Sequence, residues 1–338
     1  MSKKVWNFKG NQWGFFSLFL ELLDGLRWCE KNDYVPHIEG VKNEHYHSST
    51  GFNGSNEIWE YYFEPIKTQI NDGDNVREHY NEFLLMEIPQ NFGFRSAGSF
   101  GRRWMKGRVD EWPLVMDDDG WWREEANRVI NKFGIKPNSI VQEKINNFID
   151  DKMSAKVKIG VHIRAGRGMK GTYHTDNIKL ENYRDLTLKK IEKLGHDDYV
   201  VFVASDSNVA VNFMKDNVPN VVSYDCSRTN DYYQNGKSSN DVVEVGWNQN
   251  LQFEPNNRAK VGEEAVIECY LLSNCNMMIH WESGLAVSAS EAIVTASNEG
   301  STPKGDIAKE IWKRIYHNAP YLLKTKGTER GIKALMSC

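Results

Sequence analysis

The chain has 338 residues, with 42 Lys and Arg against 46 Asp and Glu and a formal net charge of −4. Hydrophobic residues make up 40% of the chain and charged residues 26%, which excludes fibrous and wholly disordered proteins, and the length suits two domains. A protein whose whole surface binds DNA or RNA is usually strongly basic, so we expect no nucleic-acid partner.

The first half of the chain predicts a helix and a short strand. Apolar residues recur at helical spacing over 14–31, and 34–38 is typical of a strand, so the chain opens on a glycine-rich turn, a helix and a strand. Residues 40–122 are rich in Asn, Gly and aromatics and hold few periodic runs. We expect long loops over a smaller sheet there.

The second half alternates strands with helices. Strands are predicted at 157–163, 199–204, 221–224 and 277–281, helices at 180–194, 208–217, 261–273 and 284–291, and a polar insertion at 226–258. This alternation predicts an α/β fold with a parallel, doubly wound sheet. Ligands bind such sheets at the carboxyl ends of the strands, which selects the residues after 163, 204 and 281.

Nothing in the sequence predicts secretion or a membrane span. The first lysines are followed by no apolar segment, and a span needs about 20 apolar residues in a row. Five cysteines at scattered spacings are typical of reduced thiols. We therefore expect a cytoplasmic protein.

The exit of the strand at 157–163 has the chemistry of a phosphate site. It reads His162-Ile-Arg164-Ala-Gly166-Arg167-Gly168, a guanidinium followed by glycine-rich turns, which offers charge-assisted and backbone donors. Residues 153–175 contain no acid and five cations, Lys156, Lys158, Arg164, Arg167 and Lys170. A solvated basic loop is the alternative interpretation, and the spacing of a P-loop is absent.

Three blocks, read together, resemble the GDP-fucose-dependent fucosyltransferase superfamily, which includes core α1,6-, rhizobial chitooligosaccharide and protein O-fucosyltransferases. They are His162-x-Arg164 at a strand end, Ser205-Asp206 at the next strand exit, and an acidic helix followed by a strand and Ser283. The blocks span roughly residues 155–295. Their order and spacing carry the resemblance, because His-x-Arg alone is a weak signal.

The resemblance implies a GT-B-like α/β fold, with two Rossmann-like domains facing a cleft. Residues 1–150 would form the acceptor-side domain, 151–300 the domain that binds a nucleotide sugar, and 301–338 a helical tail, which could pack back on the N-terminal domain. It further implies an inverting glycosyltransferase that transfers L-fucose from GDP-fucose to a glycan hydroxyl, with no metal and no cofactor.

The resemblance also assigns roles to residues. Arg164 would bind the β-phosphate of the donor, His162 would support the pyrophosphate, and Glu268 would contact the base or the ribose. The full set of donor-binding residues is Gly14, His162, Arg164, Gly166, Arg167, Ser205, Asp206, Glu268 and Ser283. Aromatic residues make up 12% of the chain, and eight of the 11 Trp lie in the first 122 residues. The candidates to contact an acceptor sugar are Trp13, Trp104, Trp121 and Trp122.

The sequence departs from the core α1,6-enzymes in a way that leaves the catalytic base open. Ala165 replaces their second arginine, as in the rhizobial type. An inverting transfer needs a base within hydrogen-bond reach of the acceptor hydroxyl. His174 and Asp176, just after the basic loop, are the candidates, alongside Arg164 as the third catalytic residue. The alternative interpretation of these two residues is that they belong to a polar loop in which Asp176 caps the next helix.

Three alternative functions remain. The same scaffold could use another donor, such as a UDP-pentose. Asp117 and Asp119 could hold a divalent metal in a metal-dependent transferase, although a helix cap fits Asp119 better. The chain could also be a non-catalytic glycan-binding protein. Separately, a basic and aromatic window at 88–109 could bind single-stranded nucleic acid, the donor diphosphate or an anionic acceptor, or could be ordinary solvated surface.

Overall fold

The computed structural model describes residues 2–10, 14–79, 121–164, 179–195, 197–228, 230, 233–234, 237–238, 255–280, 285 and 289. The chain forms two compact units. The first comprises Met1–Asn147, Asn250–Ser273 and Val287–Thr295, and the second comprises Phe148–Gln249, Asn274–Ala286 and Ala296–Cys338. The predicted assignment of an acceptor domain at 1–150, a donor domain at 151–300 and a tail at 301–338 stays a prediction.

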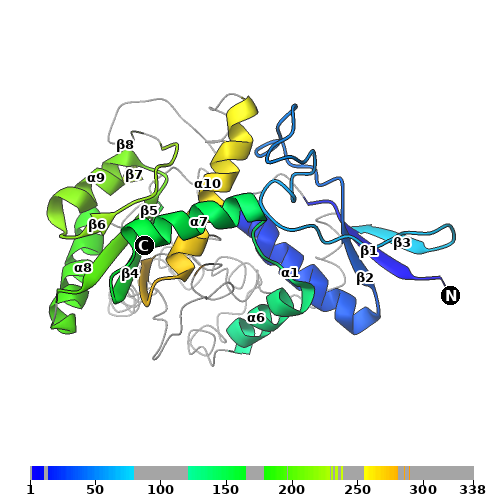
Figure 1. Cartoon of the computed structure of the whole chain (residues 1–338), viewed down its shortest axis with the longest axis horizontal. Helices are drawn as coiled ribbons and strands as arrows, with labels where there is room; N and C mark the ends of the chain where they lie inside the picture. Colours follow the sequence, from blue (N-terminus) through cyan, green and yellow to red (C-terminus); the bar gives the residue numbers. More distant parts are fainter. Residues whose placement is uncertain are drawn as a thin grey trace, which may run out of the picture. The chain divides into compact units, whose positions relative to one another are not determined.

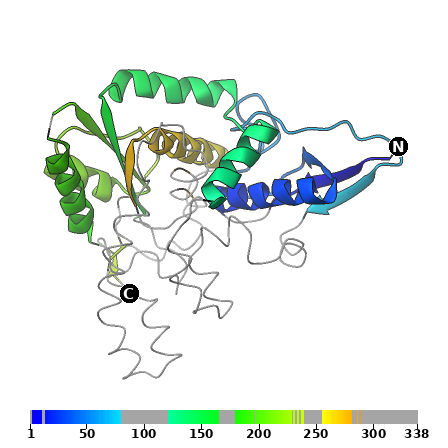
Figure 2. The same cartoon turned by 90° about the horizontal axis from the view of Figure 1, so that it is seen from below.

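The first unit contains a three-stranded parallel sheet. Its strands are β1 (Lys4–Phe8), β2 (Val35–Ile38) and β3 (Asn75–His79), in the order β2-β1-β3, and helix α1 (Phe15–Asn32) connects β1 to β2. Helix α1 lies along this sheet (Figure 1, Figure 2). The predicted helix and strand at the start of the chain are confirmed, while residues 11–13 of the predicted turn lie outside the described residues. Between residues 40 and 79, β3 is the one named strand and the rest is turns and irregular chain.

Aromatic side chains build the core of the first unit. Trp6 is fully buried, and its ring lies against Gly25 of α1, where an added Cβ would come within 2.2 Å of the ring. Phe63 stacks on Trp59 at 4.4 Å between ring centroids and on Phe15 at 5.8 Å. The aromatic excess of the first half is therefore, for these residues, core packing.

Three helices complete the first unit or begin in it. They are α6 (Trp121–Phe133), α7 (Ser139–Lys152), whose last turn belongs to the second unit, and α10 (Pro255–Ser273). Glu30 of α1 accepts two hydrogen bonds from Arg128 of α6, at 2.9 and 2.5 Å, and a third from Lys132. These charge-assisted bonds join α1 to α6.

Helix α10 is joined to the rest of the first unit by polar contacts that are buried or partly buried. Lys144 Nζ donates to both carboxylate oxygens of Glu263, at 2.7 and 2.8 Å, and Asn53 Nδ2 donates to the same carboxylate at 2.8 Å. The Tyr62 hydroxyl donates to the carbonyl of Ala259 at 2.9 Å. The sequence predicts that this helix starts at residue 261, but in the structure it starts at Pro255, a residue type favoured in the first turn of a helix. The stretch predicted as a polar insertion is therefore shorter.

The second unit is built on a four-stranded parallel sheet. The strands β4 (Val157–Ile163), β5 (Tyr199–Ser205), β6 (Val221–Val222) and β9 (Met277–His280) have the order β6-β5-β4-β9. This confirms the predicted parallel sheet, except that β6 ends at 222 and not at 224. A short antiparallel pair, β7 (Tyr233–Gln234) and β8 (Lys237–Ser238), lies in the insertion. The helix predicted at 284–291 lies almost wholly outside the described residues.

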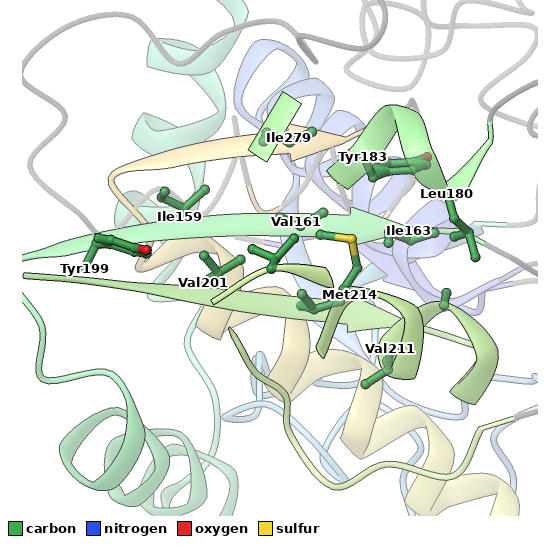
Figure 3. Packing of buried hydrophobic residues seen from close by; sticks show 13 residues of the cluster. Ile159, Val161, Ile163, Leu180, Tyr183, Tyr199, Val201, Val211, Met214 and Ile279 are labelled. Atoms are coloured by element: carbon green, nitrogen blue, oxygen red, sulfur yellow. The ribbon is translucent and has the colours of Figure 1, made fainter. Parts of the chain in front are cut away.

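Alternate residues of β4 and β5 point to opposite faces of this sheet. On one face, Ile159, Val161 and Ile163 of β4 pack with Val201 and Val203 of β5 (Figure 3). Helices α8 (Leu180–Leu194) and α9 (Asn208–Asn217) cover this face and contribute most of the remaining buried side chains, and Tyr199 of β5, Val218 after α9 and Ile279 of β9 contribute the others. On the other face, Phe148 of α7 contacts Phe202 with 5.7 Å between ring centroids. Burial on both faces explains why β5 reads as one continuous apolar run.

Candidate functional site

The three strand exits that the sequence selects lie next to one another at the carboxyl edge of the four-stranded sheet. Ile163 at the end of β4 is in register with Ser205 at the end of β5, and His162 is in register with His280 at the end of β9. Arg164 and Asp206 therefore follow neighbouring strands. The prediction that these exits share one edge is confirmed.

His162 is a buried, neutral side chain at this edge. Its exposed fraction is 7%, and it points away from the face that packs against α8 and α9. Burial, together with His280 and Arg164, lowers the pKa of His162 from 6.5 to about 3, so the imidazole carries no charge near neutral pH. Its Nδ1 has no hydrogen-bond partner among the described residues. His162 therefore offers this edge a neutral ring nitrogen and no second positive charge.

Arg164 is the first residue after β4, and its side chain is exposed. The strand that precedes it is buried from Ile159 to Ile163, so its backbone is held by a rigid element. A guanidinium in this position presents a planar set of donors that matches phosphate oxygens. The binding of a phosphate by Arg164 stays a prediction.

The turn after β5 is fixed by its serines. Ser205 Oγ accepts a hydrogen bond from the backbone N–H of Ser207 at 3.2 Å, and Ser207 Oγ accepts one from Ala210 at 3.4 Å, which caps α9. Both serines are buried and Asp206 between them is partly buried. Ser205 thus shapes the turn, while contacts of Ser205 and Asp206 with a donor stay a prediction.

Two polar residues at this edge escape sequence reasoning. His280 stands at the end of a predicted strand, so its position carried a signal. Arg228 lies in the stretch predicted as a polar insertion, yet its guanidinium donates to the carbonyl oxygens of Ser205 and Tyr224, at 2.9 and 2.7 Å. No local pattern predicts that this segment returns to the end of β5.

Gly14 and Glu268 belong to the first unit. Gly14 precedes α1, and the Phe15 N–H beside it donates to the Tyr46 hydroxyl at 2.9 Å. A Cβ at Gly14 would lie 4.0 Å from that hydroxyl, so packing among the described residues does not require glycine there. Glu268 lies on α10 and is 6% exposed. Donor contacts of both residues stay predictions.

Several predicted site residues fall outside the described part of the chain: Trp13, Trp104, Asp117, Asp119, Gly166, Arg167, His174, Asp176 and Ser283. Trp121 and Trp122 lie in α6, but their side chains are likewise outside it. The roles proposed for all of these residues stay predictions.

Within the described residues, three features are absent. No group of three or more His, Cys, Asp or Glu side chains has the arrangement of a metal site. The cysteines of this part, Cys29, Cys226, Cys269 and Cys275, form no disulfide. No helix in it has both the length and the apolar character needed to cross a membrane.

Comparison with known proteins gives matches in structure alone. No family model matches the sequence, and no curated protein matches it. The fucosyltransferase NodZ from Bradyrhizobium is similar in structure, with a TM-score of 0.50 and 16% sequence identity over 86% of this chain and 93% of that one. Arabidopsis thaliana FUT1 in complex with GDP has a TM-score of 0.44 and 12% identity, over 86% and 69% of the two chains. POFUT1 in complex with GDP-fucose has a TM-score of 0.42 and 11% identity, over 89% and 96%.

The likeness to NodZ carries the assignment of the fold. At 16% identity it shows that this chain has the α/β GT-B-like fold of that fucosyltransferase. The predicted fold class is thereby confirmed, and the resemblance drawn from the three sequence blocks is confirmed at the level of the fold.

Proposed function

We propose that the protein is an inverting glycosyltransferase that transfers L-fucose from GDP-fucose to a hydroxyl group of a glycan. The observation that carries the proposal is the carboxyl edge of the four-stranded sheet, where exposed Arg164 and partly buried Asp206 follow neighbouring strands of a GT-B-like fold. In open α/β sheets this edge is where nucleotides bind. We expect the enzyme to act in the cytoplasm and to need no metal or cofactor.

The proposed reaction is a single displacement at the anomeric carbon. The acceptor oxygen forms a bond to that carbon, its proton passes to a base, and the bond to the β-phosphate oxygen breaks with its electron pair leaving on GDP. Arg164 stabilises the negative charge that develops on the leaving diphosphate, often the largest contribution to such a transfer. His174 and Asp176 are the candidate bases, and Trp13, Trp104, Trp121 and Trp122 the candidate acceptor contacts.

The donor is identified by a thermal-shift panel of GDP, GDP-fucose, UDP and UDP-sugars. A ligand that binds only the native state stabilises it, by about 2.7 kcal/mol at one hundred times its Kd, and this raises the melting temperature. We expect the guanosine compounds to raise it and the uridine compounds to have no effect. A response to the uridine compounds alone would point to the same scaffold with another donor. A response to oligosaccharides but to no nucleotide would point to a glycan-binding protein.

Removal of the Arg164 side chain tests the phosphate site. We expect Arg164→Ala to lower turnover by roughly 10²–10³-fold, the loss typical of one donor to a developing charge. Arg184→Ala is the matched control, because Arg184 lies on α8 and pairs with Asp185. Release of GDP from GDP-fucose measures both. Wild-type turnover in a folded Arg164→Ala protein would contradict the assignment.

A further inference from the structure

At the carboxyl edge of the four-stranded sheet, the pairing between β5 and β6 stops before β5 itself ends. The two strands pair only at Val201 with Val221 and at Phe202 with Val222, although β5 continues to Ser205. Ser205 is 3% exposed. A buried carbonyl needs a hydrogen-bond partner, and the ladder that would supply one has already ended.

The side chain of Arg228 takes the place of the missing ladder. Its Nε donates to the carbonyl of Ser205 at 2.9 Å, its Nη2 to the carbonyl of Tyr224 at 2.7 Å, and its Nη1 to the carbonyl of Cys226 at 3.4 Å. One planar guanidinium thus joins the end of β5 to the segment that follows β6. A lysine has no such fork, because its three donors sit on one nitrogen.

A second contact joins the same two segments. Asn208, in the first turn of α9, donates from Nδ2 to Oδ1 of Asn230 at 2.8 Å. Asp206 therefore sits in a turn that Arg228 holds at Ser205 on one side and Asn230 holds at Asn208 on the other. Arg228 thus contacts the backbone on one side of this carboxylate, and Asn230 contacts the side chain of Asn208 on the other.

The charge of Arg228 matters as well as its shape. Three carbonyl oxygens drawn together at one edge concentrate negative partial charge, which disfavours an anionic ligand there. The guanidinium offsets that charge, and it does so on the same sheet edge as Arg164. A nucleoside diphosphate carries its negative charge on the phosphates. At this edge the positive charges of Arg164 and Arg228 offset the partial negative charge of the carbonyl oxygens.

We infer that Arg228 is a positioning residue of the nucleotide site, acting through the backbone of Ser205 to orient Asp206 toward the nucleoside of the donor. The inference rests on the proposed function, because it takes this edge as the nucleotide site. It assigns to Arg228 a role in binding the nucleotide, beyond a role in stability.

The test compares Arg228→Lys and Arg228→Met, with Arg184→Met as the control on α8. Isothermal titration gives the Kd for GDP, and circular dichroism gives the melting temperature without nucleotide. We expect Arg228→Lys, which keeps the charge but loses the fork, to raise the Kd about tenfold, the change expected when a charge-assisted hydrogen bond that supports the site is lost, and Arg228→Met, which also loses the charge, to raise it further. We expect the control to bind as the wild type does. With GDP-fucose, KM should rise more than kcat falls.

The outcomes separate this inference from the proposed function. A purely structural role would lower the melting temperature and leave the Kd unchanged, which overturns the inference. Full affinity in Arg228→Lys also overturns it, because charge without the fork would then suffice. Wild-type protein that binds neither GDP nor UDP contradicts the proposed function itself.

A measurement on the wild-type protein covers variants that do not fold. Hydrogen exchange with and without GDP should show slower exchange at 205–208 and at 224–228 together, since Arg228 links the two segments. Protection at 205–208 with none at 224–228, or at neither segment when GDP is bound, overturns the inference.

Discussion

His162 illustrates how burial decides the charge of a side chain at the proposed site. In the His-x-Arg pattern at the end of β4, the structure buries the histidine to 7% exposure beside His280. Desolvation is the largest cause of its lowered pKa, followed by His280 and Arg164. Only the arginine then supplies charge, and the histidine supplies a hydrogen-bonding ring.

This lowered pKa predicts a pH dependence of stability. The unfolded chain binds a proton at His162 below its ordinary pKa of 6.5, whereas the folded chain does so only near 3. The free energy of unfolding should therefore fall as the pH drops from about 6.5 toward about 3, because the unfolded state takes up more protons in that window.

Urea unfolding of the wild type and of His162→Gln, at about pH 7 and about pH 4.5, measures this contribution. We expect the variant to lose less stability than the wild type between the two conditions, because its amide does not titrate. Equal losses in the two proteins would show that His162 does not contribute.

At the scale of the element, α10 depends on a glycine. An added Cβ at Gly262 would lie 2.2 Å from the hydroxyl oxygen of Tyr62 and 2.9 Å from the ring of Tyr46. The same hydroxyl donates to the carbonyl of Ala259, so the tyrosine is held against the helix. Glycine is the residue that permits this approach.

We predict that Gly262→Ala destabilises the protein in spite of the better helix propensity of alanine. Overpacking costs about 1–3 kcal/mol, while replacing an interior glycine gains about 1 kcal/mol. Chemical denaturation gives the net change, with Glu192→Ala on the exposed surface of α8 as the control. An increase in stability would show that Tyr62 moves aside at little cost.

The sequence predicts the strands of the second unit well, because β4 and β5 are buried and their apolar patterns are clear. It also predicts that Arg164 and Asp206 lie at one edge, since parallel strands end together. It misses Arg228, whose partners are backbone carbonyls of other segments. It also misses Lys144, because an ion pair across 119 residues leaves no local pattern.

At the scale of the whole molecule, the first unit is discontinuous in sequence. Residues 1–147 contain its sheet and α1, yet α10 belongs to the same unit and lies beyond residue 249. The carboxylate of Glu263 is 5% exposed and pairs with Lys144. Removing Lys144 would leave the buried carboxylate of Glu263 without its cation, which is destabilising, although the 40% exposure of the Lys144 side chain reduces the cost.

We therefore predict that a fragment of residues 1–147 does not fold cooperatively by itself. It lacks Glu263 for Lys144 and Asn53, and it lacks the helix surface against which Tyr62 packs. Thermal unfolding followed by circular dichroism tests this, with the full chain as the reference. A cooperative transition near that of the full chain would contradict the prediction.

The discontinuity also sets an order of events during synthesis. Roughly 100 residues separate Asn147 from Asn250, and at about 5–20 residues per second their translation takes roughly 5–20 s. Until α10 leaves the ribosome, Tyr62 and Lys144 have none of their contacts with it. The first unit therefore cannot complete its folding until α10 has been synthesised, although most of its residues are made first. During that interval the surface that later contacts α10 is exposed and accessible to chaperones.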